Sequence, residues 1–225
     1  MKRYFTKGEI SLWFGSCAVI VISFWMFHSR DYLTLTASLV GVTSLIFNAK
    51  GNPLGPLLMV AFSLLYGVIS YSCAYYGEMI TYLGMTMPMA VIALISWLKH
   101  PYQGKKTQVK INRLQGKEWW YLAVLTAVVT AVFYFVLKAL HTDALILSTV
   151  SVTTSFAAVY LTFCRSAWYA IAYAANDLVL IVLWILASGA DSSYLSVVIC
   201  FAIFFVNDIY GFLNWQKMAR AQTAG

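Results

Sequence analysis

Apolar runs of about 20 residues recur along the whole 225-residue chain, and they constrain its fold more than any other feature. A helix needs about 20 apolar residues to cross the ~30 Å hydrocarbon core of a bilayer. Only 10% of the residues are charged, whereas about a quarter is usual for a soluble domain. So little charge could not cover a water-facing surface. The sequence therefore predicts an all-α membrane protein with a single membrane domain over residues 1–225.

Breaks rich in glycine, asparagine, proline and acidic residues divide the apolar sequence into eight predicted spans. These spans are 9–28, 31–49, 53–74, 78–98, 117–139, 142–163, 167–188 and 191–215. The first run lacks the small-residue cleavage site of a signal peptide, so we keep it as a helix. A helix lying along the membrane surface is the alternative for this segment. Pro88 predicts a kink in the fourth span.

Basic residues gather at alternate ends of the predicted spans. With the amino terminus inside, 13 of the 15 lysines and arginines are cytoplasmic: Lys2, Arg3, Lys7, Lys50, Lys99, Lys105, Lys106, Lys110, Arg113, Lys117, Arg165, Lys217 and Arg220. Only Arg30 and Lys138 fall on the other side, where the acidic residues are Asp31, Glu78, Asp143 and Asp191. The positive-inside rule then predicts cytoplasmic termini and a multi-pass protein in contact with membrane lipid. Basic residues scattered in this way do not suggest a nucleic-acid partner.

The sequence contains a weak internal repeat over residues 31–98 and 142–217. Val42-Thr43-Ser44-Leu45 resembles Thr153-Thr154-Ser155-Phe156, and Ser96-Trp97-Leu98-Lys99 resembles Asn214-Trp215-Gln216-Lys217. A unit of three helices would insert its second copy upside down unless one more helix restored the orientation. We therefore predict two parallel three-helix repeats, joined by a linker helix at 117–139 and preceded by an amino-terminal helix at 9–28.

Two acidic residues, Asp177 and Asp208, fall inside predicted spans. A charge at the bilayer centre costs at least ~2.5–3.5 kcal/mol, so such residues are usually functional. Each acid follows an asparagine, Asn176 or Asn207, and no lysine, arginine or histidine lies in a span at comparable depth. We expect these acids to stay protonated, to form hydrogen bonds within the bundle, or to face a cavity that receives a cation.

Helical spacing shows which side chains share a face with these acids. Tyr173, Asp177 and Trp184 share one face of their helix, and Asn207 and Tyr210 form a polar stripe on the last helix. The span 142–163 adds hydroxyl groups, although such groups often only join helices. Together these helices predict a pocket for a flat ring and ribose hydroxyls. Its predicted binding residues are Tyr173, Asn176, Asp177, Trp184, Asn207, Asp208, Tyr210, Thr154 and Ser155. Trp97, Trp119, Trp120 and Trp215 lie near helix ends and are expected to anchor the membrane interface.

Three segments resemble the PnuC vitamin transporters, over about residues 32–217. They are Asn-Asp-Leu-Val-Leu-Ile-Val-Leu-Trp at 176–184, Asn207-Asp208-Ile209-Tyr210-Gly211 with Trp215, and Trp97-Leu98-Lys99-His100-Pro101. The resemblance implies a bacterial inner-membrane protein with a fold like the SWEET sugar transporters. It also implies uptake of nicotinamide riboside, a precursor of NAD, by facilitated diffusion, with a cytoplasmic kinase trapping the product. The family's asparagines fall on Asn176 and Asn207. The first repeat departs from the pattern, with Met89 in place of an asparagine and Ile92 in place of a tyrosine.

Several functions remain open at this point. The fixed pyridinium charge of nicotinamide riboside suits two unpaired acids, thiamine suits them nearly as well, and neutral riboflavin does not need them. One acid could instead be a proton site that couples uptake to the gradient. An enzyme is not expected, because the chain shows no helix-borne metal set and no serine beside a deep base; no cofactor is expected either. A membrane sensor without a transported ligand is the remaining alternative, and a homo-oligomer is compatible with the sequence.

Overall fold

The computed structural model describes residues 4–27, 31–72, 76–142 and 144–224. Within these residues, eight helical segments are long and apolar enough to cross a membrane, which confirms the predicted fold class. Seven of them are α1 (Lys7–Met26), α2 (Tyr32–Ala49), α3 (Leu54–Ser72), α6 (Gly116–Ala139), α7 (Leu145–Phe163), α8 (Tyr169–Ser188) and α9 (Leu195–Ala224). The other consists of α4 (Tyr76–Ile80), the π-helix η1 (Thr81–Thr86) and α5 (Met87–Lys99).

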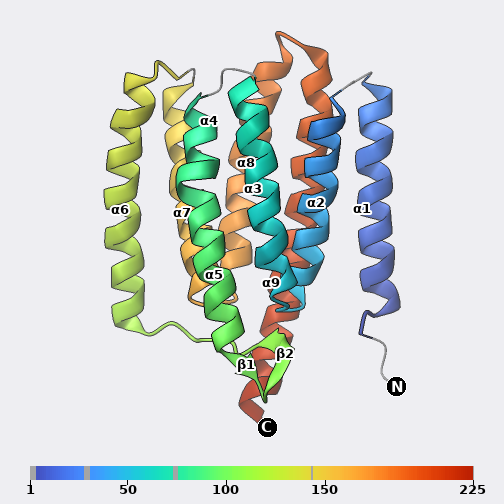
Figure 1. Cartoon of the computed structure of the whole chain (residues 1–225), viewed down its shortest axis with the longest axis vertical. Helices are drawn as coiled ribbons and strands as arrows, with labels where there is room; N and C mark the ends of the chain where they lie inside the picture. Colours follow the sequence, from blue (N-terminus) through green and yellow to red (C-terminus); the bar gives the residue numbers. More distant parts are fainter. Residues whose placement is uncertain (1–3, 28–30, 73–75, 143, 225) are drawn as a thin grey trace.

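The eight segments run alternately up and down, so that α1 begins and α9 ends at the same end of the bundle (Figure 1). We call this the terminal end and the opposite one the far end. All described lysines and arginines except Lys138 lie toward the terminal end, as the alternation of charge predicts. Arg30, Asp143 and Cys73 lie outside the described residues.

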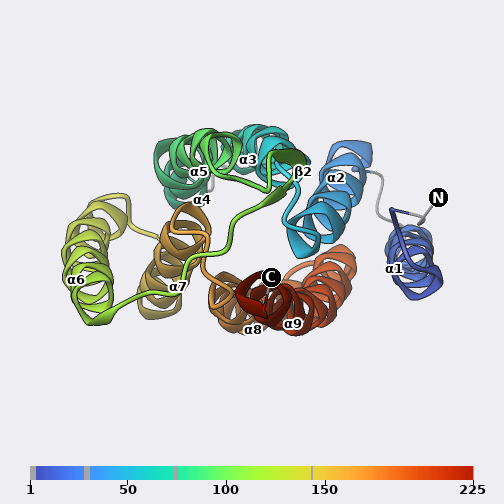
Figure 2. The same cartoon turned by 90° about the horizontal axis from the view of Figure 1, so that it is seen from below.

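Seen along the bundle, the helices form two facing rows (Figure 2). One row holds α2, α3 and α5, the other holds α7, α8 and α9, and α1 and α6 flank opposite edges. A core of aromatic and aliphatic side chains fills the space between the rows, with Phe62 and Tyr66 from α3 facing Phe201 and Phe204 from α9. Tyr173 and Trp184, two of the predicted site residues, pack against this core.

α1 runs along the bundle and packs against α2 and α9 (Figure 1). Its buried Glu9 accepts hydrogen bonds from the Lys50 ammonium at 3.0 Å and from the Tyr210 hydroxyl at 2.8 Å. The Trp13 indole N–H donates to Thr43 on α2 at 3.1 Å. These contacts exclude the alternative of a helix lying on the membrane surface.

The fourth span departs from regular α-helix just before Pro88. Pro88 has no N–H to donate, and its ring crowds the preceding turn. The chain forms the π-helix η1 there, in which the Thr86 hydroxyl donates to the Thr81 carbonyl at 3.2 Å. π-helical turns are rare and often occur at functional sites. Here the turn places Tyr82 against Tyr66, with ring centroids 5.0 Å apart.

Two features at the terminal end differ from the sequence prediction. α9 continues to Ala224 instead of ending near residue 215, and the predicted polar loop contains a hairpin, β1 (Pro101–Tyr102) with β2 (Lys105–Val109). Gln222 explains both features. Its amide donates to the Val109 carbonyl at 3.0 Å, and it accepts from the Ile111 N–H at 2.9 Å, so the last turns of α9 pack on the hairpin.

The two rows are joined at the terminal end by a reciprocal set of hydrogen bonds. The Trp97 indole of α5 donates to the Thr162 carbonyl of α7 at 2.8 Å, and the Trp215 indole of α9 donates to the Asn48 carbonyl of α2 at 2.7 Å. In the same way, Ser96 donates to Phe163 at 3.0 Å and Asn214 donates to Ala49 at 2.7 Å. Matched contacts of this kind support the predicted parallel repeat.

These bonds and the sequence motifs pair the two predicted repeats with different offsets. They pair Asn48 with Thr162, a separation of 114 residues, whereas the hydroxyl motifs pair Ser44 with Ser155, a separation of 111. The two offsets therefore differ by three residues. Three residues are nearly one helical turn, so the two registers place similar side chains on almost the same helix face.

Gly55 lets α2 and α3 approach closely beneath the reciprocal bonds. A Cβ atom at this position would lie 2.7 Å from the backbone nitrogen of Asn48, whose carbonyl receives the Trp215 bond. We expect Gly55→Ala to lower the free energy of unfolding by about 1–3 kcal/mol, because added atoms in a filled core force the backbone apart. Thermal unfolding in detergent measures this effect. Gly15→Ala is the matched control, since a Cβ at Gly15 meets nothing within 4 Å; equal loss in both variants would contradict the prediction.

Candidate functional site

A pair of buried acids forms the centre of the candidate site. Asp177 on α8 and Asp208 on α9 are 4% and 3% exposed, and their carboxyl groups are near enough to interact electrostatically. Two buried carboxylates that are near each other repel, so we expect one of them to hold a proton and the closed pair to carry at most one negative charge. Among the described residues, Oδ2 of Asp177 is buried without a hydrogen-bond partner. An unsatisfied oxygen in a bundle core is a natural contact for a ligand.

Tyrosines from both rows lie within electrostatic range of the acids. Tyr173 lies one turn before Asp177 on α8 and interacts with both carboxyl groups, while Tyr82 of η1, in the opposite row, interacts with Asp177. Tyr66 stacks beside Tyr82, and its buried hydroxyl has no partner among the described residues. The site therefore combines negative charge with aromatic faces, which is the chemistry that binds organic cations.

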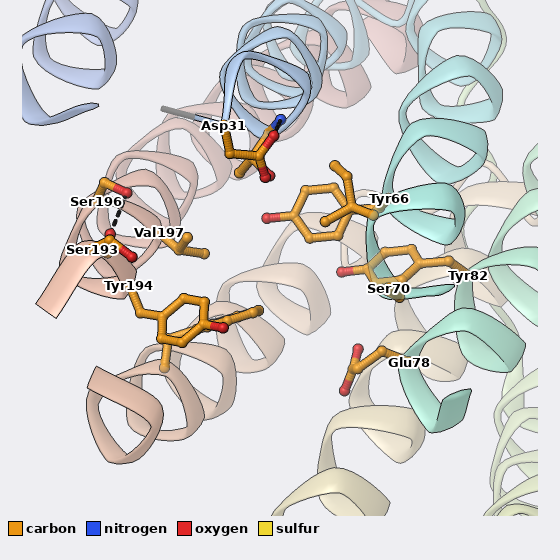
Figure 3. Close-up of a pocket in the computed structure, with 12 residues that line it drawn as sticks. Asp31, Tyr66, Ser70, Glu78, Tyr82, Ser193, Tyr194, Ser196 and Val197 are labelled. Carbon is orange, nitrogen blue, oxygen red and sulfur yellow. Dashed lines mark hydrogen bonds between the residues drawn. The ribbon is translucent and has the colours of Figure 1, made fainter. Parts of the chain in front are cut away.

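A cavity extends from the tyrosines toward the far end. It offers about 80 Å³ of enclosed space, enough for several water molecules, so a larger ligand has to push its walls apart. Its lining residues are Asp31, Thr34, Tyr66, Ile69, Ser70, Glu78, Tyr82, Trp184, Ser193, Tyr194, Ser196 and Val197. In Figure 3 the hydroxyls of Tyr66 and Tyr82 point into this space, and Tyr194 faces them from the opposite side. We call it the outer cavity.

The path on the other side of the acids is narrow and ends in a seal. A small void of about 10 Å³, with space for about one water molecule, lies among Tyr173, Asn48 and Thr162. Beyond it the Trp97 and Trp215 rings pack 5.4 Å apart, and they are 1% and 0% exposed. The structure is therefore closed at the terminal end. The expectation that Trp97 and Trp215 anchor the membrane interface is wrong, because their indole N–H groups are used between the rows; Trp119 and Trp120 of α6 are exposed.

Asn176, which directly precedes Asp177, is bonded to hydroxyl groups of α7. Ser151 and Thr154 donate to Oδ1 of Asn176 at 3.2 Å and 2.9 Å, which ties α8 to α7. Ser155 is buried on the same helix. Trp184 lies farther out, in the lining of the outer cavity, with its ring 5.2 Å from Tyr194. Of these predicted residues, Trp184 lines the outer cavity, while Asn176 directly precedes Asp177 and bonds α7.

Asn207 and Tyr210 point away from this path. The Asn207 amide donates to the Ser16 hydroxyl of α1 at 2.9 Å, and Tyr210 donates to Glu9 of the same helix. The polar stripe predicted on the last span is therefore real, but it contacts the amino-terminal helix. Tyr173, Asp177 and Asp208 are the predicted residues that the fold brings together at the centre.

Sequence reasoning missed the contribution of the first repeat. Tyr66, Tyr82, Asp31 and Glu78 line the outer cavity, yet only the two acids attracted notice, as charges at span ends. A signal was present in α3, where Phe62, Tyr66 and Ile69 recur at i, i+4 and i+7 and are all buried. Such a stripe is typical of any buried helix, so it does not by itself indicate a binding site.

Comparison with known proteins gives a consistent result. A family model described as nicotinamide mononucleotide transporter matches residues 31–217. A nicotinamide riboside transporter PnuC of Neisseria mucosa is 25% identical over 222 residues, which cover 96% of this chain and 82% of that protein. One of Haemophilus influenzae is 21% identical over 227 residues, covering 98% and 96%. The crystal structure of the vitamin B3 transporter PnuC has the same fold, with a TM-score of 0.83 at 23% identity over 97% of this chain and 94% of that one. The chain therefore belongs to the nicotinamide mononucleotide transporter family, that of the PnuC transporters.

Proposed function

We propose that this protein takes up nicotinamide riboside across the bacterial inner membrane. The observation that carries the proposal is the buried Asp177–Asp208 pair beside Tyr82 and Tyr173. A pyridinium ring has a permanent positive charge and a flat aromatic face, so it suits a pair of acids flanked by tyrosines. Two relatives that match nearly the whole chain are nicotinamide riboside transporters by name, which supports the same cargo.

Transport requires that the two ends of the path open in turn. The outer cavity lies on the far side of the acids, while Trp97 and Trp215 close the terminal end. The positive-inside rule assigns the terminal end, with both chain termini, to the cytoplasm. The substrate then enters by the outer cavity, reaches the acids past Tyr66 and Tyr82, and leaves when the tryptophan seal opens. Facilitated diffusion suffices for net uptake if a cytoplasmic kinase consumes the product, and no catalytic residue is needed.

The predicted site residues take different roles in this scheme. Asp177 and Asp208 supply negative charge and Tyr173 supplies an aromatic face, while Asn176, held by Thr154, offers its amide to ribose hydroxyls. Ser155 is buried on the same helix as Thr154, and Trp184 guides the ring through the outer cavity. Asn207 and Tyr210 act indirectly, because they hold α1 against α9.

The carboxyl pair also favours a second candidate, proton-coupled uptake. One carboxylate is sufficient to balance a bound cation, so the other carboxyl group could carry a proton inward together with the substrate. The two mechanisms differ in their response to an uncoupler. Uptake by cells or vesicles that collapses when the proton gradient is removed would establish coupling, while uptake that persists would establish facilitated diffusion.

Calorimetry on the purified protein with nicotinamide riboside, thiamine and riboflavin tests the cargo. We expect nicotinamide riboside to bind, riboflavin not to bind, and Asn176→Ala to weaken binding by about 5- to 150-fold, the value of a hydrogen bond lost in a buried site. Asn112→Ala is the control, because Asn112 lies in the loop before α6 and bonds Glu118 there. If thiamine binds and nicotinamide riboside does not, the proposed site is supported but the cargo is thiamine. No binding of any of the three would contradict the proposal.

A further inference from the structure

The outer cavity contains acidic groups that the proposed path through the central acids does not use. Glu78 at the start of the fourth span lines it, and among the described residues its carboxylate has no hydrogen-bond or ion-pair partner. Asp31 lies across the cavity as the N-cap of α2, where it accepts from the Leu33 and Thr34 N–H groups at 3.1 Å each. Figure 3 shows both carboxyl groups beside the space that the tyrosines border.

A buried polar atom also points into this cavity. Tyr66 is 4% exposed, and its hydroxyl has no hydrogen-bond partner among the described residues. In Figure 3 this hydroxyl is directed into the space between α2, α3 and the start of α9. A buried hydroxyl is expected to have a partner, so its orientation indicates that something polar occupies the cavity.

Aromatic rings form two sides of the cavity. The Tyr66 and Tyr82 rings lie 5.0 Å apart on the side of α3 and η1. The Trp184 and Tyr194 rings lie 5.2 Å apart on the side of α8 and the short 3-10 helix η2 (Ser192–Tyr194). Of the basic residues that the structure describes, only Lys138 at the end of α6 lies toward this end of the bundle, and it does not line the cavity. Carboxylates among aromatic faces, with no neighbouring cation in the lining, attract positively charged rings.

We propose that the outer cavity is a binding site of its own for a flat aromatic cation, with Glu78 and Asp31 supplying the charge and the tyrosines and Trp184 supplying the stacking faces. Neither Asp177 nor Asp208 lines this cavity, so it is distinct from the central pair. Only the role of this site rests on the proposed function, and that role is to capture the substrate before it passes Tyr66 and Tyr82. Binding at the outer site itself does not require transport.

The probe that isolates this site is 1-methylnicotinamide, a pyridinium ion without ribose, and neutral nicotinamide is its uncharged counterpart. Calorimetry is done on full-length protein carrying Asp177→Asn and Asp208→Asn, which removes the charge of the central site. We expect this protein to bind one equivalent of 1-methylnicotinamide more tightly than nicotinamide, with an affinity that falls as salt is raised. Adding Glu78→Gln should weaken the binding at least about tenfold.

Two further variants make the result specific. Tyr66→Phe removes the unpartnered hydroxyl and keeps the ring, so it should weaken binding of the probe less than Glu78→Gln does. Asp191→Asn removes a charge at the same end but outside the cavity lining. The Ser193 backbone N–H donates to Asp191 at 2.8 Å, which holds the pKa of this exposed carboxyl below its usual range, and asparagine also serves as an N-cap. Asp191→Asn should therefore leave probe binding unchanged.

The outcomes separate this inference from the proposed function. Loss of probe binding in the Asp177→Asn/Asp208→Asn protein, or equal binding with and without Glu78→Gln, would overturn the outer site. If probe binding depends on Glu78 but the protein does not take up nicotinamide riboside, the outer site is supported and the proposed cargo is wrong. Thermal unfolding midpoints of all variants exclude misfolding as the cause of lost binding.

Discussion

Trp97→Phe combined with Trp215→Phe is expected to open the terminal end of the protein. Each indole N–H donates to a carbonyl at the end of a helix in the opposite row, and both rings are almost completely buried. Phenylalanine keeps a ring but cannot donate. The two carbonyls retain a second donor, from the Arg165 and Gly51 N–H groups at 3.0 Å and 2.9 Å, so the loss per bond is the net value of about 1–1.5 kcal/mol.

The two substitutions act on the same movement, because each bond must break before the rows can separate at this end. Together they are expected to raise the population of molecules with an open terminal end by about 30- to 150-fold. The increase is smaller if the two rings, which are in contact, are energetically coupled. Cys164 is a native reporter, since it directly follows Phe163 at the end of α7 and is half-buried. Its labelling by a maleimide, followed by peptide mass spectrometry, should be faster in the double variant.

The same experiment contains its controls. Cys200 is buried in the core and should react slowly in every variant. Trp119→Phe removes a tryptophan of α6 that is 40% exposed, and it should leave Cys164 labelling as in the unaltered protein. If Cys164 reacts no faster when both sealing tryptophans are replaced, the tryptophans do not hold this end closed.

Most of the fold was predictable from the sequence because a bilayer imposes simple rules. The length of apolar runs determines where helices cross, and the placement of lysine and arginine shows which ends share a side. The continuation of α9 to Ala224 follows a different cause. Gln222 bonds the hairpin that begins at Pro101, and such contacts between distant segments leave no local pattern in the sequence.

The candidate site was only partly predictable. The cost of burying a charge identified Asp177 and Asp208 whatever their neighbours were. Helical spacing correctly grouped Asn207 with Tyr210, but spacing shows only which residues share a face, and here that face meets α1. Tyr82 was missed because it lies in a π-helical turn, where the regular period of an α-helix does not apply.

Asp177→Asn combined with Asp208→Asn has the other large expected effect, on affinity for nicotinamide riboside. The closed pair holds at most one negative charge, so one carboxylate is sufficient to neutralise one bound pyridinium ion. An asparagine in place of either acid can donate its amide to the remaining carboxylate and so preserve that charge. We therefore expect each single variant to bind within a few-fold of the unaltered protein. The double variant has no charge left and should bind about 30- to 1,000-fold more weakly, the range for removing one member of a buried charge pair.

A thermodynamic cycle of the four proteins, measured by calorimetry, tests this expectation, and thermal unfolding supplies the control. Asparagine has nearly the same shape as aspartic acid and also forms hydrogen bonds, while the double substitution removes two acids from a low-dielectric core. The protein should therefore unfold at the same temperature or higher. Affinity would then fall while stability does not, which separates loss of a binding group from loss of structure. If each single variant lost as much affinity as the double variant, both carboxylates would have to be charged around the cation. Binding would then have to expel the proton of the pair, and the protein would exchange a proton for the cation.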